Sequence, residues 1–185
     1  MLETVFQGNT WKFGDKISTD LMVPGAYVLA KKGITEAEAA QYCMHANRPD
    51  WAAQVQQGDI VVAGVNFACG SSRNWARPLQ VLGISVALAE SVSRIGLRNG
   101  INTGLPTLVC PGITNFVQEG ERLKVDIITG EVVNLTRETT IQAQAWPKDS
   151  PPFQIMMAGG FNTYFRQRLI EAGKIKPPLE TVNIS

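Results

Sequence analysis

The chain has 185 residues, of which 44% are hydrophobic and 18% charged, a balance that excludes a disordered protein and predicts a globular one. Seventeen Lys and Arg against sixteen Asp and Glu leave a net charge of +1, which predicts no partner among nucleic acids or anionic membranes. No apolar run approaches the ~20 residues that span a bilayer, and no basic region followed by an apolar stretch opens the chain, so we expect a cytoplasmic protein.

The cysteines and the histidine limit the metal chemistry of this chain. Cys43, Cys69 and Cys110 are far apart and form no CxxC motif, so we expect free thiols in a reducing compartment and no metal ligands here. Cys69 is expected to be a packed thiol. The single histidine, His45, lies in a polar, helical-looking stretch and is expected at the surface.

The first third of the chain predicts one strand followed by loops and short helices. Bulky residues alternate over residues 4–13, which is typical of a strand. Three short polar side chains at 18–20 can bond to the backbone of their own loop. Residues 35–45 open with a capping-box pattern and are predicted to be helical, and a second short helix is predicted at 51–56.

The middle of the chain alternates apolar runs with helical patterns. The order is strand, helix, strand, helix and strand, at residues 59–63, 75–82, 84–89, 91–99 and 107–110. This βαβαβ order predicts parallel pairing.

The last third of the chain has a different hydrophobic pattern. Over residues 122–145, polar and apolar residues alternate and a Thr-Gly turn occurs, which together predict antiparallel strands. Residues 153–172 carry a helical apolar stripe that Gly159 and Gly160 split into two helices. We therefore expect one domain over residues 1–173 and an extended tail over 174–185.

One stretch, Gly70-Ser71-Ser72-Arg73, stands out because it joins a buried strand to a predicted helix. Unpaired N–H groups at a helix start attract anions, and the forked guanidinium of Arg73 suits a carboxylate or a phosphate. The stretch therefore predicts an anion site with a serine hydroxyl beside it. Local physics equally allows a simpler structure, in which Ser71 or Ser72 caps the helix and Arg73 lies in solvent.

Several motifs together resemble a known family. They occur in order at residues 14–25, 58–64, 66–73, 89–95 and 98–106. In order and spacing they are similar to the small subunit of 3-isopropylmalate dehydratase and its relatives, the swivelling domain of the aconitase superfamily. Each motif alone is modest, but five in sequence make a specific signal.

The resemblance implies an α/β fold, a three-layer β/β/α swivelling domain with a mixed, mostly parallel core sheet. It also implies a reversible dehydration and rehydration that moves a hydroxyl between neighbouring carbons of a small di- or tricarboxylate such as 3-isopropylmalate. A separate large subunit is expected to carry three cysteines and a [4Fe–4S] cluster, with no cofactor bound by this chain.

The resemblance also implies roles for the serine stretch. Ser71 would be the catalytic base, acting as an alkoxide, which requires strong stabilisation of its anion. Arg73 would clamp a substrate carboxylate, and Gly70 and Ser72 would help to hold the substrate.

Further roles fall on residues outside that stretch. Residues 26–30, which include the expected substrate-binding residues Tyr27 and Val28, occupy the position that in the family lies over the variable group of the substrate, and their small or apolar side chains favour an alkyl substituent. Thr19, Asp20 and Asn66 are expected to support the loops around the serine.

One departure from the family leaves alternatives open. After Ser-Ser-Arg the family usually continues Glu-His-Ala, whereas this chain has Asn74-Trp75-Ala76-Arg77-Pro78. Arg77 could contact a substrate carboxylate or face solvent. The alternatives are a 2,3-dimethylmalate- or homoaconitate-type dehydratase subunit and a non-catalytic binding or assembly paralogue. A stand-alone serine hydrolase is disfavoured because His45 is the only histidine.

Overall fold

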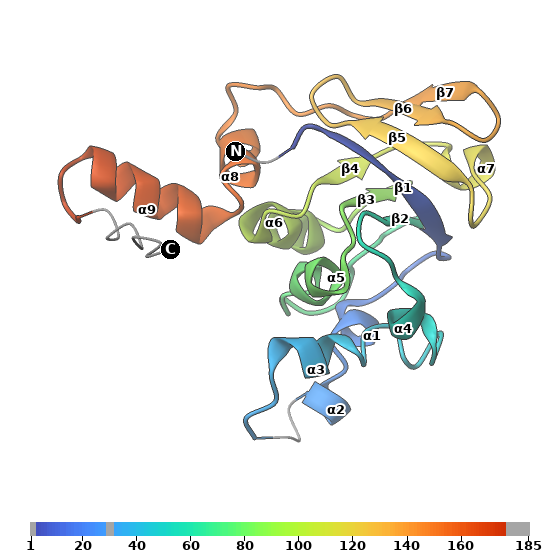
Figure 1. Cartoon of the computed structure of the whole chain (residues 1–185), viewed down its shortest axis with the longest axis horizontal. Helices are drawn as coiled ribbons and strands as arrows, with labels where there is room; N and C mark the ends of the chain where they lie inside the picture. Colours follow the sequence, from blue (N-terminus) through green and yellow to red (C-terminus); the bar gives the residue numbers. More distant parts are fainter. Residues whose placement is uncertain (1–2, 29–31, 177–185) are drawn as a thin grey trace, which may run out of the picture.

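The computed structural model describes residues 3–28 and 32–176, and its strands form one sheet (Figure 1). The strands are β1 (Val5–Lys12), β2 (Ile60–Ala63), β3 (Val86–Ala89), β4 (Thr107–Val109), β5 (Arg122–Asp126), β6 (Glu131–Asn134) and β7 (Thr139–Gln142). The helices are α1 (Thr19–Met22), α2 (Gly25–Val28), α3 (Glu36–Ala40), α4 (Trp51–Gln54), α5 (Ala76–Leu82), α6 (Arg94–Thr103), α7 (Ile113–Phe116), α8 (Pro151–Met157) and α9 (Phe161–Glu171).

The sheet changes from parallel to antiparallel at β1. Its strand order is β4-β3-β2-β1-β5-β6-β7. The pairs β1–β2, β2–β3 and β3–β4 are parallel, whereas β1–β5, β5–β6 and β6–β7 are antiparallel. The predicted βαβαβ unit and the predicted antiparallel half are both confirmed, and β1 joins them.

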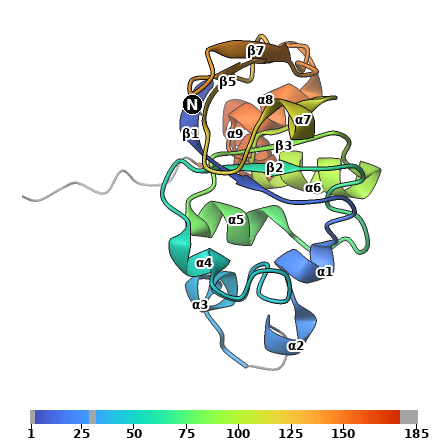
Figure 2. The same cartoon turned by 90° about the vertical axis from the view of Figure 1, so that its right-hand side faces the viewer.

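The parallel strands are buried on both faces, which explains their continuous apolar sequences. One face of β2 and β3 packs against Trp51, Trp75 and Leu79 from α4, the turn before α5 and α5 itself. The other face packs against a core built from β5, β6 and α8. Figures 1 and 2 show β5–β7 on one side of the parallel strands and α1–α5 on the other, so the expected three-layer β/β/α fold is confirmed.

The C-terminal part divides as predicted. The helical stripe breaks at Gly159 and Gly160 into α8 and α9. No residue of α9 is buried, and the helix projects from the body in Figure 1. Most of the predicted tail, residues 177–185, lies outside the described residues. None of the described helices is long and apolar enough to cross a membrane.

Three local predictions were inexact. The capping box at Thr35 and Glu38 is present, but α3 ends at Ala40 and turns follow it. The polar loop at 18–20 contains the start of α1, because the Val23 N–H closes a helical turn onto the Thr19 carbonyl at 2.8 Å. Helix α6 runs on through the predicted turn and ends at Gly104, which has the left-handed backbone of a helix C-terminus.

Glu90, directly after β3, holds the next strand connection in place. Its carboxylate accepts hydrogen bonds from Gly112 N (2.6 Å), Thr114 N (2.8 Å) and Thr114 Oγ1 (2.5 Å). Partial burial opposes ionisation, but the bonds from Thr114 and Gly112 outweigh it, so the pKa of Glu90 lies below its usual value.

We expect Glu90→Gln to lower the free energy of unfolding by about 1–2 kcal/mol at pH 7, since charged acceptors form the stronger bonds. A pKa that is lower in the folded state gives stability that is present above the unfolded pKa, ~4.3, and is lost as pH falls through the folded pKa. Urea unfolding measures this at pH 7 and pH 3. The free energies of unfolding of variant and wild type should differ less at pH 3 than at pH 7. Glu131→Gln, at an exposed carboxylate, is the matched control. An equal difference at both pH values would contradict the role of the charge.

Candidate active site

The serine loop, residues 64–75, leaves the carboxyl end of β2 and is held first by the connection between β3 and α6. Ser91 Oγ accepts a hydrogen bond from Asn66 N at 2.9 Å, and the Ser91 carbonyl accepts one from Phe67 N at 2.9 Å. Phe67 returns the contact, because its carbonyl accepts from Ser93 N at 2.9 Å. Asn66 thus supports the loop through its backbone, whose φ is +59°.

The start of α6 presses directly on the loop. Ser93 Oγ donates to the Ala68 carbonyl at 2.6 Å. A Cβ on Gly96 would lie 2.6 Å from the Ala68 Cβ, so only glycine allows this approach. Gly70, with φ +94°, then turns the chain toward Ser71 in a conformation that L side chains rarely adopt.

Thr19, at the start of α1, holds the other side of the loop. Its backbone N–H donates to the Cys69 carbonyl at 2.8 Å. Its fully buried side chain accepts from Ser71 N at 3.1 Å and lies 3.0 Å from Ser71 Oγ. The Thr19 hydroxyl therefore touches both the backbone and the side chain of Ser71.

Two groups meet Ser71 Oγ. The Thr19 hydroxyl lies 3.0 Å from it, with either oxygen able to donate, and it also donates to the Ser71 carbonyl at 3.3 Å. The backbone N–H of Arg73 donates to Ser71 Oγ at 3.4 Å. A negatively charged Ser71 Oγ can only accept, so the Thr19 hydroxyl would then donate to it beside the Arg73 N–H, and both donors favour that charge.

Arg73 is paired and does not lie alone in solvent. Its Nη1 forms an ion pair with Asp20 Oδ1, and both side chains remain partly exposed. The guanidinium has five N–H groups, so a second carboxylate can bind beside Asp20. The structure therefore brings Thr19, Asp20, Ser71 and Arg73 into one cluster.

The alternative in which a serine caps the helix is wrong. Trp75 occupies the N-cap position of α5, with no side-chain cap bond, and the helix begins only at Ala76. Because a helix dipole acts mainly within its first turn, the start of α5 also contributes less at Ser71 than the sequence suggested. The donors at Ser71 Oγ come from Thr19 and Arg73 instead.

The unusual residues after Arg73 have structural partners. Trp75 is fully buried, donates from Nε1 to the Gly96 carbonyl at 3.0 Å and meets Phe67 edge to face. Asn74 Oδ1 accepts from Thr103 Oγ1 at 2.8 Å and from Arg77 N at 3.3 Å. Pro78 falls in the first turn of α5, where helix N–H groups have no intrahelical partner anyway.

The remaining predicted site residues lie at the edge of this cluster or away from it. Gly70 and Ser72 are exposed, and the Ser72 carbonyl accepts from Asn99 Nδ2 at 3.5 Å. Tyr27, on α2, is 42% exposed and stacks on Tyr42 with ring centroids 4.8 Å apart. The Val28 side chain lies outside the described residues.

His45 belongs to the Tyr27 group and not to the serine loop. Its ring lies edge-on to Tyr27 at 5.5 Å, and its Nδ1 is 3.2 Å from the Pro49 carbonyl. The predicted surface position is only partly correct, because the residue is half-buried.

The cysteines have no ligand geometry. Cys43 is fully buried, and burial raises the pKa of its thiol. Burial, aided by the charge of Glu90, raises the pKa of Cys110 to about 11. Cys69 is half-buried, with its Sγ 3.5 Å from the Lys16 carbonyl. In the described ranges no three His, Cys, Asp or Glu side chains gather as a metal site, so these residues do not fit an iron–sulfur cluster.

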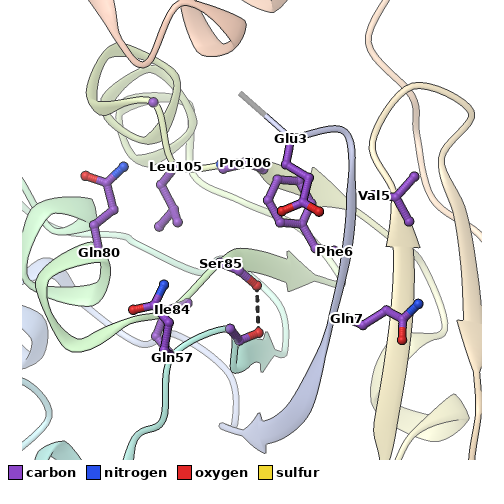
Figure 3. A pocket seen from close by; sticks show the side chains of 12 residues that line it. Glu3, Val5, Phe6, Gln7, Gln57, Gln80, Ile84, Ser85, Leu105 and Pro106 are labelled. Atoms are coloured by element: carbon purple, nitrogen blue, oxygen red, sulfur yellow. Dashed lines mark hydrogen bonds between the residues drawn. The ribbon is translucent and has the colours of Figure 1, made fainter. Parts of the chain in front are cut away.

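A cavity of about 610 Å³ lies at the opposite ends of the parallel strands, away from the serine loop (Figure 3). Gln57, Gln80, Ser85 and Leu105 are among its lining residues, and none of the predicted site residues lines it. Ser85 Oγ donates to the Gly58 carbonyl at 2.8 Å there.

Comparisons with known proteins agree with this architecture. Residues 17–112 match the aconitase C-terminal domain family. The chain is 40% identical over 172 residues to the isopropylmalate/citramalate isomerase small subunit of Methanocaldococcus jannaschii, covering 92% of this chain and 99% of that protein. It is 42% identical over 167 residues to the 3-isopropylmalate dehydratase small subunit of Methanosarcina acetivorans, covering 89% and 99%.

A third relative carries a different substrate in its name, and a solved structure extends the likeness to the fold. The homoaconitase small subunit of Methanothermobacter thermautotrophicus is 33% identical over 183 residues, covering 98% of this chain and 95% of that protein. The crystal structure of 3-isopropylmalate dehydratase from Methanocaldococcus jannaschii superimposes with a TM-score of 0.83 at 31% identity, covering 92% and 99%. The chain therefore belongs to the 3-isopropylmalate dehydratase small-subunit family of the aconitase superfamily.

Proposed function

We propose that this chain is the small subunit of a hydro-lyase that isomerises an alkyl-substituted malate such as 3-isopropylmalate. Ser71 is its catalytic base and Arg73 its carboxylate receptor. The observation that carries the proposal is the convergence of Thr19 Oγ1 and Arg73 N on Ser71 Oγ, beside the Arg73–Asp20 ion pair.

The chemistry follows from that arrangement. Water is lost from two neighbouring carbons of the substrate: Ser71 Oγ removes the proton from the carbon beside a carboxylate and returns it in the reverse direction. A serine hydroxyl is a very weak acid, so its anion needs donors already in place. Thr19 and the Arg73 N–H supply two, and the cationic Arg73 side chain adds a favourable field.

Arg73 then has two tasks. Its ion pair with Asp20 fixes the guanidinium at the edge of the serine loop. Its remaining N–H groups can bind the substrate carboxylate in a bidentate manner and draw off the charge that develops there. Gly70 and Ser72, both exposed, line the approach.

In this proposal, α2 contacts the variable group of the substrate. Only Val23 and Pro24 separate that helix from α1, so Tyr27 and Val28 follow Asp20 closely in the chain. An apolar segment there favours an alkyl substituent over a third carboxylate. A homoaconitate-type acid is the second candidate, favoured by the 33% identity to a homoaconitase small subunit.

The rest of the site belongs to a partner. Two large apolar side chains are exposed here: Val65 (50% exposed) in the serine loop itself, and Ile95 (52% exposed) on α6, which packs against the loop. A large subunit that covers them would bury apolar surface and close the site against water. We assign the [4Fe–4S] cluster to that subunit, where it supplies a Lewis acid for the departing hydroxyl.

A non-catalytic paralogue is less consistent with the structure. The altered residues Asn74 and Trp75 serve helix packing and leave Ser71 and Arg73 in place. A serine hydrolase is also disfavoured, because His45 packs with Tyr27 and Tyr42 and not with Ser71.

We expect Ser71→Ala, combined with a large subunit under anaerobic conditions, to lower kcat about 10²- to 10⁴-fold, the usual contribution of a positioned base. KM should change little, because Arg73 keeps its carboxylate site. Hydration of alkyl-substituted maleates, followed by the loss of their absorbance, measures both constants. Ser85→Ala, at the opposite end of the strands, is the control. Wild-type rates from the Ser71→Ala complex would refute the assigned base.

Thr19→Val tests the donor to Ser71 Oγ with almost no change in shape. The variant should lower kcat about tenfold to a hundredfold, because one stabilising donor is lost. It should also raise the pKa of the base, so the rise of kcat with pH moves to higher pH. Thr19→Ser, which keeps the hydroxyl, should retain both the rate and the pH profile. A pH profile that does not move in Thr19→Val would contradict the donor role.

A further inference from the structure

An ion pair in which two N–H groups share one carboxylate oxygen joins α5 to α3. Arg77 donates from Nε at 3.0 Å and from Nη2 at 2.6 Å to the same oxygen, Oε2 of Glu36. The hydrogen bond from Arg77 lowers the pKa of the Glu36 carboxyl, so both partners are charged at neutral pH. Both side chains are exposed, 49% and 63%.

Arg77 is coupled to the serine loop through the backbone. Helix α5 begins directly after that loop, and the Arg77 N–H donates to Asn74 Oδ1 at 3.3 Å. Asn74 also accepts from Thr103 at the end of α6. Asn74, the residue after Arg73, therefore links Arg77 to the end of α6.

Glu36 lies at the end of the segment that follows α2. It is the first residue of α3 and lies within the capping box, in which Thr35 N donates to Glu38 Oε2 at 2.9 Å and Glu38 N donates to Thr35 Oγ1 at 3.2 Å. The capping box fixes the residue at which α3 begins, and the bonds from Arg77 to Glu36 connect this end of α3 to α5.

The other end of the same segment has its own attachment. Tyr27 stacks on Tyr42, and the Met44 N–H donates to the Leu21 carbonyl at 2.8 Å. Aromatic packing thus holds α2 to the turn after α3. A largely apolar hollow of about 220 Å³, lined by Met22, Ala39 and Val81 among others, lies beside the ion pair and leaves α3 and α5 incompletely packed.

We infer that Arg77 is a positioning residue that sets substrate selection, by anchoring α3 and with it the substrate-facing α2 segment to α5. This inference rests on the proposed function. An exposed ion pair adds little to global stability, but two charge-assisted hydrogen bonds from one guanidinium restrict the relative position of the two helices. Because the substituent does not react, a displaced α2 segment weakens ground state and transition state alike, so KM rises while kcat stays nearly constant.

The inference differs from a direct contact between Arg77 and the substrate. Nε and Nη2 are both engaged with Glu36. If Arg77 bound substrate itself, Glu36→Gln would release it and KM would stay equal or fall. If the pair is an anchor, Glu36→Gln and Arg77→Leu raise KM alike.

The test uses the complex with the large subunit and three variants: Arg77→Leu, Glu36→Gln and the exchanged pair Arg77→Glu with Glu36→Arg. KM for 3-isopropylmalate should rise about threefold to tenfold in both single variants, with kcat nearly unchanged. The preference for 3-isopropylmalate over its shorter methyl analogue, 3-methylmalate, measured as the ratio of the two kcat/KM values, should narrow by a similar factor. The exchanged pair should recover most of the loss. Arg137→Leu breaks a surface pair with Glu121 in the antiparallel half and is the control.

A second measurement follows the anchor directly. In the chain without its partner, backbone amides of residues 36–44 should exchange with deuterium faster in Arg77→Leu than in wild type, and not in Arg137→Leu. Faster exchange with unchanged selectivity in the complex would overturn the inference and leave the proposed function intact. Unchanged exchange would overturn the anchor itself. A wild-type complex inactive on every substituted malate would refute the proposed function, and this inference with it.

Discussion

The parallel pairing of β1 with β2 is the constraint on which the site depends. It places Trp11 beside Val61, so the segments that follow β1 and β2 both leave the sheet at the carboxyl ends of these strands. Hydrogen bonds continue the pairing past the strands, from Phe13 N to the Val62 carbonyl at 2.7 Å and from Lys16 N to the Val65 carbonyl at 2.8 Å. Without this pairing Thr19 would not reach Ser71, because more than fifty residues separate them.

In the proposed function, this site would prepare a weak acid for proton transfer without a histidine. Ser71 Oγ lies among a hydroxyl, a backbone N–H and a guanidinium that is held by Asp20. Each of these groups is held by the fold, so little reorganisation would be needed if charge developed on that oxygen. Thr19 is fully buried and Arg73 partly exposed, so the buried side of the cluster supports Ser71 and the other side is open to solvent.

The residues after Arg73 show that a site can be kept while its surroundings change. Trp75 fills the core between the serine loop and α6. Asn74 accepts hydrogen bonds from the first turn of α5 and from the last turn of α6. Arg77 is then available to reach α3. Contacts to α6 and to α3 thus come from neighbouring residues directly after the serine loop.

Local patterns were sufficient for most elements. Continuous apolar runs predicted the parallel strands, a Thr-Gly turn predicted the β5–β6 hairpin, and two glycines predicted the break between α8 and α9. Helices α2 and α7 were missed, because a single turn of helix carries no periodic signal. The helix after Asn74 was predicted one residue early.

The sequence by itself determined the fold class, the family and the serine stretch, because these depend on short-range periodicity and on motifs in order. Only the tertiary structure decided which groups meet Ser71. The resemblance led us to expect Thr19 and Asp20 among the residues that support the serine loop, but their individual contacts come from the fold: Thr19 is fully buried with its hydroxyl 3.0 Å from Ser71 Oγ, and Asp20 pairs with Arg73. The same holds for Arg77, whose partner Glu36 is forty-one residues away. Contacts of this kind arise from parallel pairing and helix packing across long chain separations, which no local pattern encodes.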